Sequence, residues 1–428
     1  MKLLFVLGRV YPNDDANSNI FNRIAYNLIS TYNDISIHEL GIIDNSRVSL
    51  HSTVNGIKVT GMPDPFFSRL SKDLCEYLVS AHAGSRNDRM GLLLNRPLFA
   101  LEYIFKKIVY GNLEKKYRSE IKEIIRREHI DVVISVSYPF HTCYATAKAK
   151  IKIPFIYYQL DPFFSHYQQK NRYLAMKKEE YVCKRTFHIF MTDLIHKEYE
   201  SSALKKYLAK STMIEFPSIR KIEISDDPID LIDNQCTHTF MFIGSTYSDI
   251  RSPLYCLDLF NQLADSGRDF KLYFIGPRYG IFNEKINELI KSLDSKVCFL
   301  ERVSSKQADI LLSKADFLVN IGNSINNQMP SKIFDYFSVG KPIINFYKNS
   351  NCPTLKYTKR YPLCINILET EEVSDEIVTQ ITKFVDQYKI RSLSFEEVSS
   401  IYDSCTVQHI TDNIKKILNE AVSRKTER

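Results

Sequence analysis

Short apolar runs recur along the first half of the chain, and segments with helical spacing follow them. Strands that are apolar on both faces and alternate with helices are typical of a parallel sheet covered by helices on both sides. We therefore predict a doubly wound α/β domain over residues 1–216. Its strands are expected within residues 2–8, 131–137, 154–161, 187–192 and 211–216.

The alternation pauses after this domain and then restarts. Residues 217–237 are polar, contain two prolines and lack a helical period, which indicates a linker. A second doubly wound domain is predicted over 238–405. Ligands of such sheets bind at the carboxyl ends of the strands, so we expect the site in a cleft that the two domains face. The second set of apolar runs occupies residues 240–244, 271–276, 297–301, 317–322 and 342–346.

Residues 63–128 depart from this pattern. Apolar residues near helical spacing are flanked there by clusters of Lys and Arg. The segment is either a helical hairpin that completes the first domain's core, or a helical insert that docks on an anionic membrane or holds a lipid-linked acceptor. Helical spacing alone does not distinguish these two interpretations.

The composition narrows the class of protein. The chain has 428 residues, 44% hydrophobic and 25% charged, which is typical of a soluble protein with more than one core. A net charge of +7, spread along the chain, favours an anionic ligand or membrane surface and does not suggest nucleic acid. The nine cysteines lack C-x-x-C spacing, which indicates reduced thiols. We expect a cytoplasmic protein, at most peripheral at the inner face of the plasma membrane.

The clearest chemistry lies in a helix that Pro330 is predicted to open, because proline suits a first helical turn. The free N–H groups and dipole of a helix start near Met329 attract a phosphate oxygen, and Ser331 and Lys332 add a hydroxyl and a positive charge. Asp335 follows three residues later on the same face. Its carboxylate suits the vicinal hydroxyls of a ribose. Phosphate donors beside a diol acceptor predict a nucleotide site.

This segment resembles the donor-binding signature of the retaining GT-B glycosyltransferases with an E-x7-E motif (glycosyltransferase family 4-like). Asp335, Gly340 and Pro342 match the second acid, glycine and proline of that signature. The resemblance implies that Asp335 binds the ribose and that the start at Ser331–Lys332 faces the diphosphate. Asp replaces the usual second Glu. Asn327 replaces the first acid, which normally contacts the transferred sugar, so the amides around Asn327 are the candidates for that contact.

The resemblance continues along the second domain. Residues 240–253 are similar to the family's first strand and loop, where a small-residue turn and basic residues hold the diphosphate. Gly244 and Ser245 would form the turn, and Arg251 would contact phosphate. A solvated surface arginine is the alternative. The resemblance adds four donor-side candidates, Pro277, Arg278, Arg302 and Val303.

The first domain matches more loosely. Its first loop contains Asn17 and Ser18, which the resemblance places on the acceptor side and which also suit capping of the next helix. Leu160 stands where many members carry a functional His, and Asp161 follows it. We expect Asp161 to contact the acceptor or act in catalysis, with a helix cap or loop ion pair as the alternative. His141 is a further acceptor-side candidate, and a structural role is its alternative.

The resemblance implies transfer of a sugar from a nucleoside-diphosphate sugar, with retention. The basic insert and the 26 tyrosines favour a saccharide or lipid-linked acceptor, in bacterial surface polysaccharide synthesis. Asp161, Arg251 and Lys332 are the predicted catalytic residues, the two cations stabilising the departing phosphate. We predict no metal and no cofactor besides the donor. The last helix, within 406–428, is expected to cross back to the first domain.

Two other classes stay open. A sugar-nucleotide epimerase shares the architecture, and a catalytically silent nucleotide-sugar-binding subunit is favoured by Asn327 and Leu160. A nicotinamide dehydrogenase is disfavoured, because no G-x-G-x-x-G follows the first strand of either half.

Overall fold

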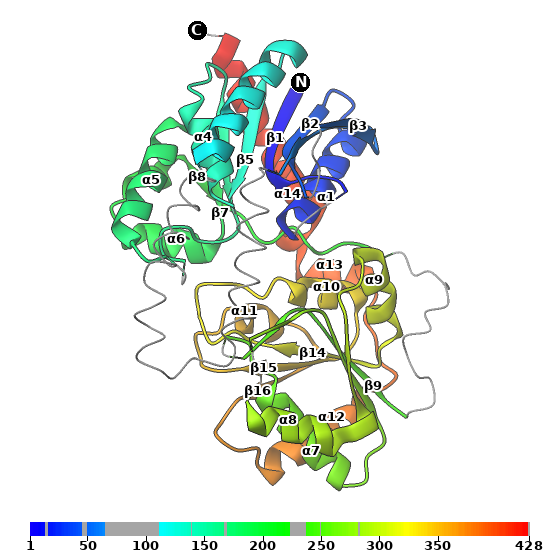
Figure 1. The fold of residues 1–428 in the computed structure, drawn as a ribbon. Coiled ribbons are helices and arrows are strands. Elements are labelled where there is room, and N and C mark those ends of the chain that lie inside the picture. Colours follow the sequence, from blue (N-terminus) through cyan, green and yellow to red (C-terminus); the bar gives the residue numbers. More distant parts are fainter. Residues whose placement is uncertain are drawn as a thin grey trace. The chain divides into compact units, whose positions relative to one another are not determined.

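The computed structural model describes residues 1–12, 16–44, 49–64, 111–137, 139–166, 169–222, 237–248, 250–280 and 283–426. The chain divides into two compact units (Figure 1). The first unit is Met1–Glu215 with Val407–Arg428, and the second unit is Phe216–Thr406. Each unit is built on a parallel sheet, so the predicted α/β class with two parallel-sheet domains is confirmed. None of the helices within the described ranges is long and apolar enough to cross a bilayer.

The first unit contains an eight-stranded sheet in the order β3-β4-β2-β1-β5-β6-β7-β8, parallel except for the antiparallel edge pair β3–β4. Its strands are β1 (Lys2–Arg9), β2 (Ser36–Ile43), β3 (Leu50–Val54), β4 (Ile57–Pro63), β5 (Val132–Ser137), β6 (Phe155–Gln159), β7 (His188–Met191) and β8 (Ser211–Met213). Its helices include α1 (Ala16–Thr31), α4 (His141–Lys148), α5 (Arg172–Arg185), α6 (Asp193–Glu200), the 3-10 helix η1 (Lys205–Lys210) and α14 (Val407–Thr426).

Of the predicted insert, Pro63 ends strand β4 and residues 111–128 form a helix. Its buried residues Leu113 and Tyr117 pack on the core of the first unit, and the Tyr117 hydroxyl donates to the carbonyl of Leu7 at 2.8 Å. This part of the insert therefore completes the core rather than presenting an apolar face to a membrane. Residues 65–110, on which the rest of the prediction falls, lie outside the described residues.

Helices α1 and α14 cover the other face of the first sheet and lie side by side (Figure 1, blue and red). Phe5 of β1 packs edge-on against Phe21 of α1, with ring centroids 5.9 Å apart. The hydroxyl of Thr411 in α14 donates to Oδ1 of Asn27 in α1 at 2.6 Å. The C-terminal helix thus belongs to the first unit, although the whole second unit precedes it in sequence.

The second unit contains a six-stranded parallel sheet in the order β13-β11-β9-β14-β15-β16 and a two-stranded sheet, β10-β12. Its strands are β9 (Thr239–Ile243), β10 (Thr246–Tyr247), β11 (Lys271–Ile275), β12 (Arg278–Tyr279), β13 (Val297–Leu300), β14 (Phe317–Ile321), β15 (Ile343–Tyr347) and β16 (Cys364–Leu368). Its helices are α7 (Leu254–Asp265), α8 (Glu284–Leu293), α9 (Ser305–Lys314), α10 (Lys332–Val339), α11 (Leu355–Thr358), α12 (Asp375–Tyr388), α13 (Phe395–Ile401) and the 3-10 helices η2 (Asp294–Lys296) and η3 (Asp403–Cys405).

Helices α7, α8 and α12 cover one face of the second sheet, and α9, α10 and α13 lie on the other (Figure 1). Helix α10 ends at Gly340, whose φ of +77° is a left-handed conformation that glycine adopts without strain. A Cβ there would lie 2.1 Å from the carbonyl oxygen of Leu393. The glycine therefore ends the helix and allows the backbone at Leu393 to pack directly against it.

The described part of the predicted linker, residues 217–222, packs within the second unit. The N–H groups of Ser218 and Ile219 both donate to the carbonyl of Cys405 at 3.1 Å. Ile219, 1% exposed, also forms a β-bridge with Thr406. The residues that enter the second unit and those that leave it are therefore hydrogen-bonded to each other.

Candidate functional site

The strand order of the second sheet defines a switch point. From β9 the chain proceeds to β11 and β13 on one side, and later to β14, β15 and β16 on the other side. Loops that leave the carboxyl ends of β9 and β14 therefore diverge, and such a point is where parallel α/β sheets bind ligands.

Arg251, in the loop after β9, is fixed at this switch point. Its Nε donates to Oδ1 of Asn323 at 3.0 Å, and its Nη1 donates to the carbonyl of Ser245 at 3.4 Å. Asn323 follows β14, is 1% exposed, and donates its own Nδ2 to the carbonyl of Gln328 at 3.2 Å. Burial lowers the pKa of Arg251 from its ordinary value. The predicted phosphate arginine is thus an oriented side chain, and Asn323 is a site residue that the sequence did not single out.

The loops after β9 and β11 run close together at the same edge. A Cβ at Gly276 would lie 2.4 Å from the carbonyl oxygen of Gly244, so a glycine is needed at this approach. The short strands β10 and β12 then pair, and the rings of Tyr247 and Tyr279 stack with centroids 5.1 Å apart. The structure therefore brings four predicted donor-side residues to one edge, Gly244, Ser245, Pro277 and Arg278.

Helix α10 begins at Lys332, two residues after the predicted start at Pro330. Ser331 is the N-cap residue and its side chain makes no capping bond, while Pro330 precedes the cap instead of occupying the first turn. The first turn is closed by bonds from the N–H of Ile333 to the carbonyl of Pro330 and from the N–H of Phe334 to that of Ser331, both 3.2 Å. The hydroxyl of Tyr336 accepts the N–H of Ile243 at 2.7 Å, which anchors α10 at the carboxyl end of β9.

Lys332 and Asp335 lie on the same face of α10, as their spacing predicts. Nζ of Lys332 is 3.0 Å from Oδ2 of Asp335. The lysine side chain is 45% exposed and the aspartate side chain 10%. The two groups that the sequence assigns to phosphate and ribose therefore pair with each other in this structure. Met329 is buried and Asn327 half-buried in the segment that leads into the helix.

Two predicted residues stand apart from this group. Arg302 and Val303 follow β13, the edge strand, with β11 between it and β9. Arg302 is exposed. Arg278 connects the two places, because its guanidinium lies 5.3 Å from the ring centroid of Phe299 in β13.

The acceptor-side candidates follow adjacent strands of the first sheet. Asn17 and Ser18 lie in the first turn of α1, which is described from Ala16 onward. The Ser18 hydroxyl donates to the carbonyl of Arg9 at 2.7 Å and ties α1 to the end of β1. His141 opens α4 after β5, with its ring 5.5 Å from that of Tyr117.

Burial sets the protonation of the ionisable candidates in the first unit. It lowers the pKa of His141 to about 4, so this imidazole is neutral at pH 7. Burial raises the pKa of Asp161, just after β6, to about 6. Strongly shifted pKa values are common at functional sites, so Asp161 stays a candidate for contact with the acceptor or for catalysis. Leu160 is 2% exposed and offers no polar group.

A buried acid that the sequence did not reveal supports the loop that carries Asp161. Glu179 of α5 accepts the N–H of Phe164 at 3.1 Å and the hydroxyl of Tyr199 at 2.7 Å. That hydroxyl also accepts Nε2 of Gln159, the last residue of β6, at 2.8 Å. Burial, as the largest cause, raises the pKa of Glu179 to about 7. Only its helical position in a charged run was visible in the sequence.

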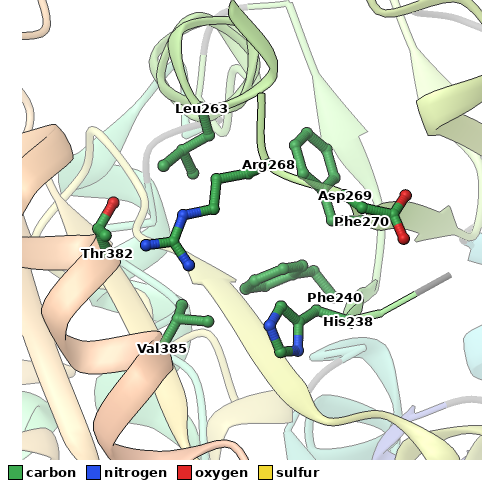
Figure 2. A pocket seen from close by; sticks show the side chains of 8 residues that line it. All are labelled: His238, Phe240, Leu263, Arg268, Asp269, Phe270, Thr382 and Val385. Carbon is green, nitrogen blue, oxygen red and sulfur yellow. The ribbon is translucent and has the colours of Figure 1, made fainter. Parts of the chain in front are cut away.

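A small pocket in the second unit lies elsewhere (Figure 2). It opens at the amino ends of β9 and β11, and the Arg268 side chain extends into it. Because the strands are parallel, this is the edge opposite to Arg251 and α10. Its lining residues are His238, Phe240, Leu263, Arg268, Asp269, Phe270, Thr382 and Val385. Over the described parts of both units, no cluster of three or more His, Cys, Asp and Glu is arranged to hold a metal ion.

Solved structures similar to this chain share its fold over almost the full length. A sucrose-phosphate synthase from Thermosynechococcus elongatus matches with a TM-score of 0.61 at 9% identity, covering 99% of this chain and 100% of that chain. A glycosyltransferase from Rickettsia africae matches with a TM-score of 0.60 at 12% identity, covering 98% of each chain. HepE from Anabaena, in complex with UDP, matches with a TM-score of 0.56 at 12% identity, covering 98% of this chain and 100% of that chain.

The chain has the GT-B fold. This follows from the two parallel-sheet units and their agreement with glycosyltransferase structures from end to end. No family model matches the sequence, and no curated protein matches it. At identities of 9–12% the likeness concerns the fold, so the chemistry must be argued from the residues of this chain.

Proposed function

We propose that this chain is a glycosyltransferase that moves a sugar from a nucleoside-diphosphate sugar to a saccharide or lipid-linked acceptor. UDP-sugars are the donors we propose first. The observation that carries the proposal is the group at the carboxyl edge of the second sheet. Arg251 is held by Asn323 at the switch point, and the same edge carries the start of α10 with Lys332 and Asp335. Two cations and a helix start suit a diphosphate, and the carboxylate suits a ribose.

The solved structures support the choice of ligand. HepE is described in complex with UDP, and an E. coli structure of matching fold, TM-score 0.60, is described as bound with UDP-2-fluoro glucose. The residues at the carboxyl edge of the second sheet in this chain have chemistry that suits the same class of ligand.

In the proposed reaction the bond between the anomeric carbon and the β-phosphate oxygen breaks. The acceptor oxygen bonds to that carbon on the same face, and its proton passes to the departing phosphate oxygen, so configuration is retained. Negative charge grows on the leaving diphosphate, and Arg251 and Lys332 stabilise it. Asp161 contacts the acceptor. Retention, independence of metal, a cytoplasmic site and a place in surface polysaccharide synthesis belong to the proposal. Retention rests on the resemblance, and the other three rest on the sequence.

A silent nucleotide-sugar-binding subunit is the second candidate. It is favoured by two positions at which the resemblance expects a functional side chain. Leu160 is apolar and 2% exposed, and Asn327 replaces an acid. Such a subunit would bind the donor without turning it over.

Calorimetric titration with UDP, GDP, dTDP and ADP tests the donor site, using the wild type, Lys332→Ala and Asp335→Ala. We expect one nucleotide to bind and both variants to lose about tenfold or more of the affinity. Unchanged affinity in both variants would refute the site. Release of the nucleotide from its sugar only when an acceptor is added identifies a transferase. Binding without release identifies the silent subunit, and sugar interconversion without acceptor identifies an epimerase.

A further inference from the structure

Arg220 is a charged residue beside the proposed donor site that the sequence placed in the linker. Its guanidinium Nη2 lies 2.5 Å from Oδ1 of Asp309 in α9 and 3.9 Å from Oδ1 of Asp335 in α10. Its backbone N–H donates to the hydroxyl of Ser338, one turn further along α10, at 3.2 Å. The side chain is 18% exposed. The arginine is thus fixed between two helices by its main chain and its side chain.

The distances divide the Asp335 carboxylate between two cations. Oδ2 faces Lys332 at 3.0 Å, and Oδ1 faces Arg220 at 3.9 Å. The two cations differ in exposure, because the Lys332 side chain is 45% exposed and the Arg220 side chain only 18%. A diphosphate that binds at the start of α10 competes with Asp335 for Lys332. A buried carboxylate that loses its counter-ion is strongly destabilised.

We infer that Arg220 is a positioning residue for donor binding: it remains the counter-ion of Asp335 and so leaves Lys332 available to the diphosphate. Asp309 holds the guanidinium in place for this role. The inference rests on the proposed function and adds a residue to the same site. It makes the affinity for the phosphate part of the donor depend on an arginine that contacts no part of the ligand.

The test compares UDP with uridine, since Lys332 is proposed to contact only the phosphates. In the wild type, UDP should bind more tightly than uridine. In Arg220→Gln, Asp335 keeps Lys332 in its ion pair, so UDP affinity should fall about tenfold while uridine affinity changes little. Arg220→Lys retains the charge and should recover most of the UDP affinity. Both ligands are titrated by ligand-observed NMR, with thermal melting as the check on folding.

Two further variants separate this role from a purely structural one. Arg220→Gln combined with Asp309→Asn removes the Arg220–Asp309 ion pair without leaving the Asp309 carboxylate unpaired. It should lower the ratio of UDP to uridine affinity to the same extent as Arg220→Gln does. Arg268→Gln breaks an ion pair with Asp386 at the opposite edge of the sheet and should leave the ratio unchanged. If the ratio of UDP to uridine affinity is unchanged both in Arg220→Gln and in Arg220→Gln with Asp309→Asn, the role of Arg220 is wrong while the proposed function stands. If the wild type binds none of UDP, GDP, dTDP and ADP, both the proposed function and the role of Arg220 are wrong.

Discussion

The Nε–H of Arg251 donates a 3.0 Å hydrogen bond to Oδ1 of Asn323, and this bond joins the loops on either side of the switch point in the second sheet. An arginine held in this way needs little ordering when a phosphate binds. Asn323 has a second role, because its Nδ2 donates to the carbonyl of Gln328 in the loop that leads to α10. One amide therefore positions both Arg251, the proposed phosphate contact, and the loop that leads to α10.

Replacement of Asn323 by Ala should weaken UDP binding about tenfold, because a hydrogen bond to a charged group contributes roughly 1.5–3 kcal/mol. Calorimetric titration measures this change. Asn261→Ala, which removes an amide bonded to Asp265 on the exposed side of α7, is the matched control and should bind UDP as the wild type does. Equal affinity of the Asn323 variant and the control would contradict the role of the amide.

Lys332→Ala should reduce UDP affinity about tenfold to a hundredfold while leaving uridine affinity within about twofold, because the lost charge faces the phosphates. Lys291→Ala provides the control, since this lysine is exposed in the last turn of α8. Competition titrations with the two ligands give the ratio. A parallel loss for both ligands would show that Lys332 acts through the structure of α10 instead.

Asp335→Asn tests the proposed ribose contact. The wild type should prefer UDP to 2′-deoxy-UDP about tenfold, because the carboxylate accepts hydrogen bonds from the ribose hydroxyls. The amide variant should lose most of this preference. The measurement is the ratio of the two dissociation constants, with Asp265→Asn, an exposed acid of α7, as the control. A preference for UDP that persists in the variant would place the ribose elsewhere.

The pH profile tests Asp161. Its carboxyl has a pKa raised by burial to about 6, so the carboxylate form, which accepts a hydrogen bond from the acceptor hydroxyl, predominates above that pH. We expect kcat/KM of the transfer reaction to rise with pH through about 6. Asp161→Asn should lower kcat by about a hundredfold or more and remove this rise. A rise near pH 6 that persists in the variant would assign the titration to another group.

Glu179 should make stability depend on pH in the opposite direction to ordinary surface acids. Burial raises its pKa from 4.5 to about 7 in the folded protein. Between these values the folded state keeps a proton that the unfolded state has released, so the free energy of unfolding falls as pH rises. Glu179→Gln should flatten the change of the urea midpoint between pH 5 and pH 7. Glu180→Gln is the control, because the pKa of that partly exposed acid is lowered by hydrogen bonds to Lys206 and Lys177.

Much of the fold could be predicted from the sequence because its strands are continuous apolar runs. The donor-side candidates Gly244, Arg251 and Lys332 could be placed at strand ends and a helix start for the same reason, although their roles stay predictions. The antiparallel edge pair β3–β4 and the paired strands β10 and β12 were not predicted. Strands β10 and β12 have two residues each, too few for a readable period.

The residues that the sequence did not reveal depend on partners far along the chain. Asn323 acts through Arg251, 72 residues away, and Arg220 through Asp309, 89 residues away. Their contacts exist only once the order of strands and helices is known. Arg220 was assigned to a linker because its neighbours are polar and lack a helical period, and such composition carries no information about tertiary pairing.

The bridge between Ile219 and Thr406 gives the second unit the form of an insertion whose two ends meet. Replacing residues 216–406 with the corresponding segment of a related protein would exchange the whole second unit and leave the first unit and the last helix unchanged. Under the proposed function, one such replacement would change the donor preference.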